Sequence, residues 1–448
     1  MHIDFFLSQF KKTLDNDAII WNDTHYSYNW LVEHIEKWSK KLKSNGINAS
    51  SVVAIDGIFS PNTVAMLFAL VEMQCIIIPL YKINIKKSNE LFDICMIDFF
   101  IVIRKNVKIK SIKSNKKKYN KFYDCLKKQK HPGLVLLSSG SSGRPKAAVH
   151  DFISLLEKFK TKRNSLRTIN FLQFDHWGGL NTMFHTLANL GVLIFTENRT
   201  PEHLCKLTEE FGIELWPVSP TFLNLLLISE SYKKFNLQSL KIISYGSEPM
   251  NEYILKKCNK IFPNVKLHQT YGLIEVGVLH SKSERNDSLW VKMGGDGYKT
   301  RIVDNILQIK SNSTMLGYLN AKSPFTDDGW FNTEDEVEVK GDYFRILGRK
   351  SEIINVGGEK VYPIEIENII QELEEIIEVT VFGEKNHLIG SIVCAKIRVN
   401  HKTNKKEIIQ KIKNHCRENM ERYKVPVKII IDDKIQYSNR FKKERIIS

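Results

Sequence analysis

The stretch GLVLLSSGSSGRPKAAVH (residues 133–150) runs from an apolar segment into a loop of glycines and serines, and then into Arg144, Pro145 and Lys146. Its apolar part predicts a buried strand, and we expect the loop to lead from that strand into a helix. Backbone N–H groups and hydroxyls in such a loop can surround an anionic chain, with Lys146 as the counter-charge. The same composition is also typical of an ordinary surface turn. Other parts of the chain have to decide between an anion-binding loop and a surface turn.

The loop does not match two well-known motifs of similar composition. A P-loop NTPase has glycine before the lysine and Ser or Thr after it, whereas this chain has Pro145 and Ala147 there. The order of glycines and serines also fails the G-x-S-x-G pattern of serine hydrolases.

The flanking segments favour an α/β fold. Apolar runs at 17–21, 51–55 and 75–80 alternate with amphipathic helical patterns at 28–47 and 62–74. This alternation predicts βαβ units and a parallel sheet, and it resumes after the serine-glycine loop.

The last third of the chain has a different pattern. Two hairpins with turns at Asp304-Asn305 and Gly341-Asp342 are followed by a helix that begins at Pro363, two strands, a basic helix and a final strand. A chain of 448 residues is also too long for one simple core. We therefore expect an N-terminal domain over residues 1–349 and a smaller α+β domain over residues 350–448.

Composition excludes several classes of protein. With 42% hydrophobic and 26% charged residues, the chain is typical of a soluble globular protein. It has no apolar run long enough for a membrane span, and the first residues do not resemble a signal peptide. Seven scattered cysteines without a C-x-x-C pair predict reduced thiols in a cytoplasmic protein, and no zinc spacing is present.

The net charge of +16 is concentrated in one segment. Residues 104–130 contain twelve Lys or Arg and a single acid, Asp124. Such a run is typical of a solvated face, and it could also dock an acidic partner. Because no helix-turn-helix, zinc-finger or RNP signature accompanies it, we expect no nucleic-acid partner.

Three further stretches carry residues suited to a nucleotide. They are YGSEPMN (245–251), QTYGLIEVG (269–277) and the segment 328–367. Turns at the carboxyl ends of parallel strands line ligand crevices. Tyr271 offers an aromatic face for a base, Glu275 a carboxylate for Mg²⁺, and Asp335 an acceptor for ribose hydroxyls.

With these four motifs in order, nearly the whole chain resembles the adenylate-forming superfamily, which contains acyl-CoA synthetases, carrier-protein adenylation domains and luciferases. The resemblance implies an α/β fold in which a large N-terminal domain of layered βαβ units carries a small barrel-like sheet and is followed by a small, mobile α+β domain. It also implies the reaction. A carboxylic acid and Mg·ATP give acyl-AMP and pyrophosphate, and a phosphopantetheine thiol, on CoA or a carrier protein, then takes the acyl group.

The resemblance assigns roles residue by residue. The residues implied to hold the phosphates are Ser138, Ser139, Gly140, Ser141, Ser142, Gly143 and Lys146. Those implied to form the adenine slot and its surroundings are Gly246, Ser247, Glu248, Pro249, Thr270, Tyr271 and Gly272. Asp335 would bind the ribose with Arg349 beside it, and Glu275 would bind Mg²⁺.

A catalytic lysine is implied near the C-terminus. In the tail DKIQYSNRFKKERIIS (433–448) this role falls on Lys442, with Lys443 as the neighbouring candidate. Phe441 stands where the family usually has glycine.

Three other departures keep a second interpretation open. Ile274 replaces the usual Thr or Ser before Glu275, Glu334 replaces the glycine before Asp335, and Ser351 occupies the hinge position. Losing one hydrogen bond to a charged group costs roughly 1.5–3 kcal/mol, which slows a reaction without abolishing it. The alternative is a catalytically weakened acyl or adenylate binder.

The substrate is predicted from the segment 171–191. Asp175 suits an amino-acid-activating enzyme that loads a carrier protein, but alignment on His176 and Gly179 favours the acyl-CoA synthetase pattern. We expect a fatty or aromatic acid without an amine, in a pocket lined by Trp177, Met183, Phe184 and Leu187. Gly357 and Gly358 stand where the family passes the phosphopantetheine arm, since glycine leaves room against the backbone.

Overall fold

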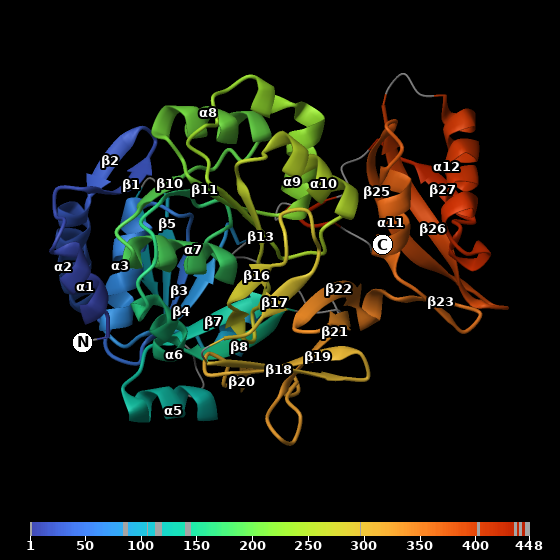
Figure 1. Ribbon diagram of the computed structural model, residues 1–448. Coiled ribbons are helices and arrows are strands. Elements are labelled where there is room, and N and C mark those ends of the chain that lie inside the picture. Colours follow the sequence, from blue (N-terminus) through green and yellow to red (C-terminus); the bar gives the residue numbers. More distant parts are fainter. Residues whose placement is uncertain are drawn as a thin grey trace.

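The computed structural model describes residues 2–83, 88–104, 106–112, 119–138, 145–295, 297–400, 404–433, 437–438 and 441–443 (Figure 1). Within these residues the strands form two seven-stranded sheets, a six-stranded sheet, a two-stranded sheet and a five-stranded sheet. The predicted α/β architecture is confirmed.

The first seven-stranded sheet carries the strands that lead to the nucleotide motifs. Its order is β13 (Lys266–Gln269), β12 (Ile242–Tyr245), β11 (Leu215–Val218), β9 (Arg167–Ile169), β10 (Val192–Phe195), β1 (Asp17–Trp21) and β2 (Thr24–Ser27). All neighbours are parallel except β1 and β2. The carboxyl ends of its parallel strands therefore share one edge.

The second seven-stranded sheet is mixed. Its order is β20 (Gly317–Tyr318), β8 (Lys146–Asp151), β7 (Gly133–Ser138), β4 (Ile76–Leu80), β3 (Val52–Asp56), β5 (Phe99–Ile103) and β6 (Val107–Ser111). β7 and β8 are antiparallel neighbours, with Ser138 opposite Lys146. The prediction that the serine-glycine loop leads into a helix was therefore wrong. The short apolar run Ala147–Val149 has no period that distinguishes a strand from a helix start.

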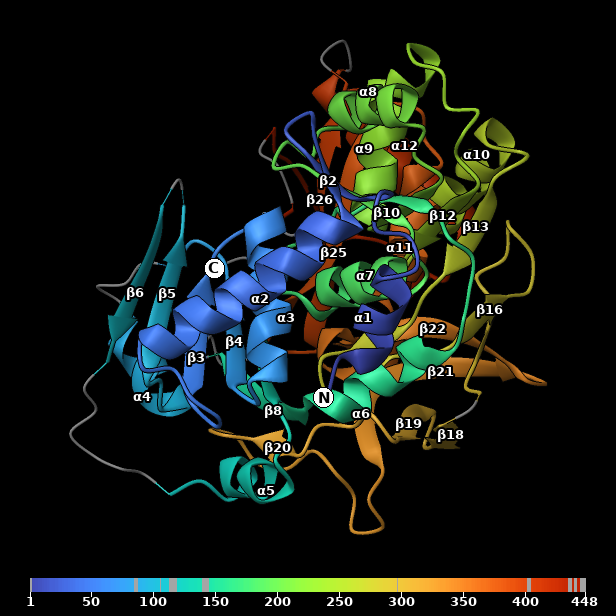
Figure 2. The same ribbon diagram turned by 90° about the vertical axis from the view of Figure 1, so that its left-hand side faces the viewer.

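Helices lie between and outside the two sheets. Side chains from both sheets share one core with the central helices, α2 (Tyr28–Ser44), α3 (Pro61–Glu72) and α7 (Trp177–Ala188), and with α1 (Asp4–Phe10) and α6 (Phe152–Leu156). Figure 2 shows α1, α2, α3 and α7 next to one another. The outer face of the first sheet packs on α8 (Pro201–Phe211), α9 (Pro220–Ser229) and α10 (Glu252–Ile261). The outer face of the second packs on α4 (Asn89–Cys95) and α5 (Lys121–Gln129).

A third, barrel-like sheet closes the large domain. Its order is β16 (Ser281–Ser283), β17 (Val291–Met293), β22 (Tyr343–Arg349), β21 (Phe331–Lys340), β19 (Ile306–Ser311) and β18 (Tyr298–Val303). Both predicted hairpins are present, because β18 pairs with β19 and β21 pairs with β22 around the predicted turns. The short strands β14 (Gly272–Leu273) and β15 (Gly277–Val278) lead into this sheet.

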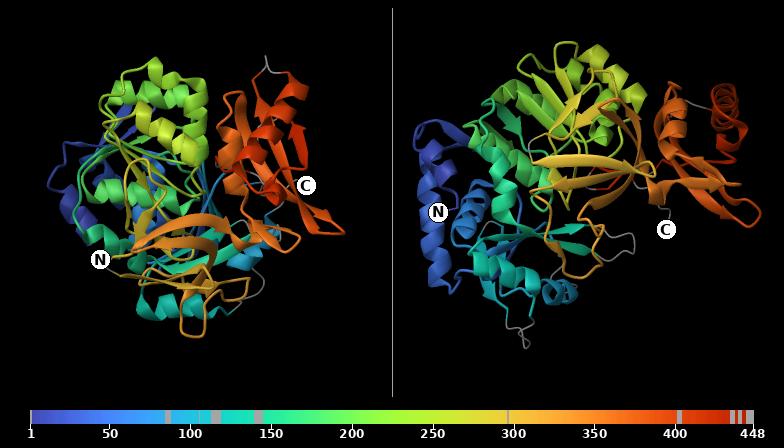
Figure 3. Two further views of the ribbon diagram at one scale, coloured as in Figure 1. Left: turned by 45° about the vertical axis from the view of Figure 1, so that its right-hand side comes forward. Right: turned by 60° about the horizontal axis from the view of Figure 1, so that its bottom comes forward.

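The small domain has a core of its own, and Figure 3 shows it standing beside the large domain. Its elements are β23 (Ile354–Val356), β24 (Glu359–Val361), α11 (Pro363–Gln371), β25 (Ile376–Asn386), β26 (Gly390–Val399), α12 (Lys405–Asn419) and β27 (Lys428–Ile431). Every buried member of that core follows residue 350. The domain boundary between residues 349 and 350 stays a prediction. No helix in the described part of the chain is long and apolar enough to cross a bilayer.

Candidate active site

Two of the predicted motifs leave the first sheet side by side. β12 and β13 pair in parallel with Tyr245 opposite Gln269, so Gly246 and Thr270 follow at the same edge. A Cβ atom on Gly246 would lie 2.5 Å from both the carbonyl oxygen and Oγ1 of Thr270. Thr270 is held in place because its N–H and its hydroxyl both donate to the Tyr245 carbonyl, at 2.8 and 3.1 Å. Only glycine at position 246 allows this approach.

A buried polar junction joins this edge to the third sheet. The Tyr271 hydroxyl donates to Asp335 Oδ2 at 2.5 Å, and Arg349 Nε lies 3.3 Å from Asp335 Oδ1. Asp335 and Arg349 face each other across β21 and β22. Burial raises the pKa of the Asp335 carboxyl, and the Arg349 charge opposes that rise. The structure thus brings together three residues that the sequence assigned to the ribose and the base.

The predicted metal ligand lies beside the predicted phosphate lysine. Glu275, between β14 and β15, accepts a hydrogen bond from the Tyr318 hydroxyl at 2.5 Å. Lys146 Nζ lies 5.6 Å from the centroid of the same ring. Tyr318 was missed by the sequence analysis, because it stands in a two-residue strand with no motif around it.

Glu275 fits a magnesium ion that is shared with phosphates. Among the described residues there is no group of three or more His, Cys, Asp or Glu side chains that could hold a metal. Mg²⁺ at nucleotide sites is ordinarily bound through one or two carboxylates plus phosphate oxygens and waters. A single carboxylate near Lys146, the lysine predicted to bind phosphate, is consistent with that donor set.

The C-terminal tail reaches the same edge of the large domain. The Lys443 N–H donates to Glu248 Oε2 at 3.1 Å, while Glu248 Oε1 accepts from the Thr221 N–H at the start of α9. Lys443 Nζ donates to the fully buried Glu367 Oε2 at 2.9 Å and to the Val379 carbonyl at 3.0 Å. Lys443 is therefore held by the small domain through its side chain. Its backbone, directly after Lys442, reaches the edge of the first sheet that carries Gly246, Glu248 and Tyr271, which we call the nucleotide edge.

The substrate segment leads into α7. His176 caps this helix, since its Nδ1 accepts from the Gly178 N–H at 3.0 Å. At Gly179 a Cβ would lie 2.5 Å from the Gln173 carbonyl. Trp177, Met183, Phe184 and Leu187, predicted to line the pocket, are all buried in the core between the two sheets, so Phe184 does not line a pocket. Its ring packs against other rings in the core between the two sheets, those of Phe6, Phe68, Phe152 and Phe159. An apolar helical stripe cannot by itself distinguish a core from a pocket.

Of the other predicted residues, two glycines lie apart from this edge, two residues lie beside members of the site, and five lie outside the described residues. Gly357 and Gly358 form the exposed turn between β23 and β24, with φ of +63° and +97°. Ser138 ends β7 opposite Lys146, and Gly272 starts β14. Ser139, Gly140, Ser141, Ser142 and Gly143 lie outside the described residues.

Two departures from the family pattern retain a glycine-like backbone. Glu334 has φ of +60° and Phe441 has φ of +53°. A left-handed conformation costs a residue with a side chain about 1–2 kcal/mol. The chain path at both motifs therefore stays in the glycine conformation although the glycine is replaced. Ser247, two residues before Pro249, also has a positive φ, of +72°.

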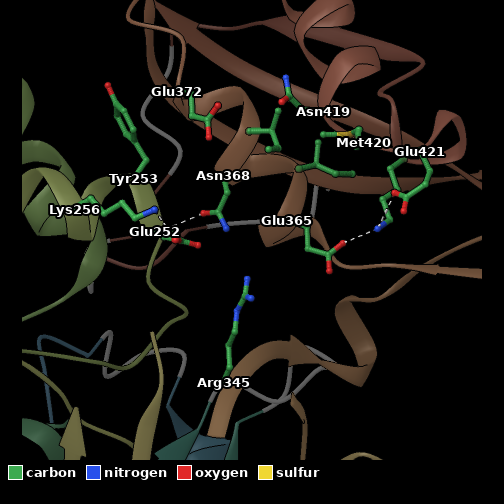
Figure 4. A pocket seen from close by; sticks show the side chains of 13 residues that line it. Glu252, Tyr253, Lys256, Arg345, Glu365, Asn368, Glu372, Asn419, Met420 and Glu421 are labelled. Carbon is green, nitrogen blue, oxygen red and sulfur yellow. Dashed lines mark hydrogen bonds and ion pairs between the residues drawn. The ribbon is translucent and has the colours of Figure 1, made fainter. Parts of the chain in front are cut away.

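A cavity of about 470 Å³ lies between α10 of the large domain and α11 and α12 of the small domain (Figure 4). It is lined by side chains of both charges, among them Glu252, Lys256, Arg345 and Glu365. None of the predicted site residues lines it, so it is distinct from the nucleotide edge.

Comparison with known proteins agrees with this geometry. The sequence profile of the AMP-binding enzyme matches residues 86–306, and that of the AMP-binding enzyme C-terminal domain matches residues 365–442. The chain belongs to the AMP-binding enzyme family. Its predicted class, an acid–thiol ligase that acts through an acyl-AMP, is confirmed.

Relatives of this AMP-binding enzyme are CoA ligases. It is 24% identical to an indoleacetate–CoA ligase of Aromatoleum aromaticum, over 85% of this chain and 84% of the relative. It is also 24% identical to a 2-succinylbenzoate–CoA ligase of Listeria innocua, over 92% of each chain. The crystal structure of the anthranilate CoA ligase AuaEII in complex with anthranoyl-AMP has the same fold, with a TM-score of 0.84, 16% identity, and coverage of 99% of this chain and 95% of that one.

The contact between Gly246 and Thr270 gives a first prediction. Gly246→Ala should weaken ATP binding at least about tenfold and lower the unfolding midpoint, because overpacking against a backbone carbonyl costs typically 1–3 kcal/mol. Isothermal titration with ATP and thermal unfolding measure the two effects. Gly57→Ala is the matched control, since its Cβ would meet only ordinary contacts with Ile103, the nearest at 3.4 Å. Equal behaviour of the two variants would contradict the proposed role of Gly246.

Proposed function

We propose that this enzyme joins an aromatic carboxylic acid to coenzyme A, with Mg·ATP as the second substrate. The proposal rests on the contact of the Lys443 N–H with Glu248. This contact lies at the sheet edge where Tyr271 binds Asp335, so the preceding residue, Lys442, would be close to the nucleotide. The aromatic substrate class is supported by the relatives, which are named for indoleacetate and 2-succinylbenzoate.

In the proposed first step a carboxylate oxygen attacks the α-phosphorus of ATP and pyrophosphate leaves. Negative charge builds up on the phosphoryl oxygens, so catalysis consists mainly of positioning and of cation placement. Lys442 would contact the acid and the α-phosphate, while Lys146 would face the outer phosphates. Asp335 would accept hydrogen bonds from the ribose hydroxyls. Glu275 would hold Mg²⁺, which neutralises phosphate charge when it is bound.

The pocket for the acid is proposed at the start of α7. His176 and Gly179 would lie beside the acyl group, because both stand where the chain enters the helix from the nucleotide edge. His176 is fixed there by its hydrogen bond to the Gly178 N–H, which leaves the proton of a neutral ring on Nε2.

For the second step we propose that residues 350–448 reorient as a unit. The exposed turn at Gly357-Gly358 would then face the thiol arm, and the CoA sulfur would attack the acyl carbon and release AMP. All seven cysteines, each within the described part of the chain, are free thiols, which supports our proposal of a cytoplasmic enzyme.

The product analysis tests this proposal directly. Purified protein is incubated with Mg·ATP and single acids, including indoleacetate, 2-succinylbenzoate, anthranilate and fatty acids of several lengths. We expect AMP and pyrophosphate to form only when a suitable acid is present, and acyl-CoA to appear when CoA is added. Formation of ADP and orthophosphate instead would refute the proposed reaction, and transfer only to a carrier protein would refute CoA as the acceptor.

The two tail lysines should behave differently. Lys442→Ala should lower acid-dependent pyrophosphate exchange about 10²–10³-fold, the cost of removing one group that stabilises transition-state charge, with little change in ATP affinity. Lys443→Ala should instead lower the stability of the small domain, because it removes the ion pair between Lys443 Nζ and the buried Glu367. Exchange assays and urea unfolding of both variants separate the two roles. Unchanged exchange in Lys442→Ala would remove Lys442 from the mechanism.

Ile274 favours a second candidate, a weakened relative. It is partly buried against the core near Met315 and presents no hydroxyl beside Glu275. Ile274→Thr should raise the exchange rate about tenfold if a hydrogen bond to the α-phosphate is what the wild type lacks. Ile274→Val is the control that trims the side chain without adding a hydroxyl. If both variants lose activity equally, the isoleucine serves packing alone.

A further inference from the structure

Phe441, directly before Lys442, is anchored on the large domain. Its ring lies 5.1 Å from that of Phe171 and 6.2 Å from that of Phe222, measured between centroids. The guanidinium of Arg199 stands over both Phe441 and Phe171, at 5.1 and 5.6 Å from the ring centroids. These partners all belong to the large domain, so the ring is a contact of the tail across the domain boundary.

The local turn presents this ring while keeping the tail compact. The Phe441 N–H donates to the Ser438 carbonyl and the Ser438 N–H donates to the Lys442 carbonyl, both at 2.9 Å. Tyr437 stacks on Phe441 at 5.5 Å with an interplanar angle of 14°. Phe441 sits in the left-handed region, which disfavours any side chain here, so the ring contacts must offset that strain.

The two neighbours of Lys442 therefore hold it from both sides. Phe441 packs on the aromatic cluster of the large domain, while the Lys443 amide binds Glu248 of the same domain. A glycine before the lysine would supply the same backbone turn but no ring contact. The phenylalanine adds a side-chain contact with the large domain in the observed orientation of the small domain.

We propose that Phe441 is a positioning residue that fixes Lys442 at the nucleotide edge for the adenylation step. On this proposal, which rests on the proposed function, the ring must leave the Phe171–Phe222–Arg199 cluster before the small domain can reorient for thioester formation. Phe441 thus favours the first half-reaction and slows the change to the second.

The two half-reactions are measured separately to test this. With an acid that supports exchange, Phe441→Gly should lower pyrophosphate exchange about tenfold or more, whereas thioester formation from synthetic acyl-AMP and CoA should be unchanged or faster. Phe441→Tyr keeps the ring and should restore exchange. Unchanged exchange in Phe441→Gly, or an equal loss in both half-reactions, would overturn the proposal, because the latter is the result expected for a purely structural residue.

A second measurement needs no substrate. Limited trypsin digestion of the native protein, followed by intact mass, reports cleavage after Lys442 and Lys443. We expect Phe441→Gly to be cleaved there about tenfold faster than wild type, with Phe441→Tyr close to wild type. Tyr119→Gly, which removes an aromatic side chain that is 80% exposed, serves as the control. Equal cleavage rates in wild type and Phe441→Gly would show that Phe441 does not anchor the tail. If no acid supports pyrophosphate exchange, only the proposed function is refuted.

Discussion

The buried carboxylate of Asp335 and its neighbour Glu336 set the geometry of this enzyme. Asp335 binds the Tyr271 hydroxyl and faces Arg349, which ties the nucleotide edge to the third sheet. Glu336, 2% exposed, accepts from Lys360 Nζ and the Tyr362 hydroxyl, both at 2.7 Å, on the small domain. A buried charge that loses its partners is strongly destabilising. Strand β21 therefore carries both the carboxylate that contacts the nucleotide edge and the carboxylate that contacts the small domain.

The tail adds a restraint at the opposite end of the small domain. Lys443 binds Glu248 of the large domain through its amide and the buried Glu367 of the small domain through its side chain. The small domain is thus held at its first strands by Glu336 and at its last described residues by Lys443. The reorientation that we propose for the second step would have to release both contacts.

The departures of this chain from the family pattern alter side chains more than backbone. Glu334 and Phe441 both keep positive φ angles at positions where the family has glycine. The motif geometry thus survives substitutions that would otherwise redirect the chain. Ile274 differs from these two substitutions, because it stands where the family has a hydroxyl-bearing residue and not a glycine.

Local sequence was sufficient for most elements and for the motifs, because strand and helix periods and the residue types at strand ends are properties of short segments. Tertiary structure decided what each side chain contacts. It placed Phe184 in the core, joined β7 to β8 instead of to a helix, and brought Tyr318 to Glu275 across 43 positions. It also gave Lys443 its contacts with Glu248, Glu367 and the Val379 carbonyl. Local sequence could not predict these contacts, because the positions of the partners depend on the packing of distant segments.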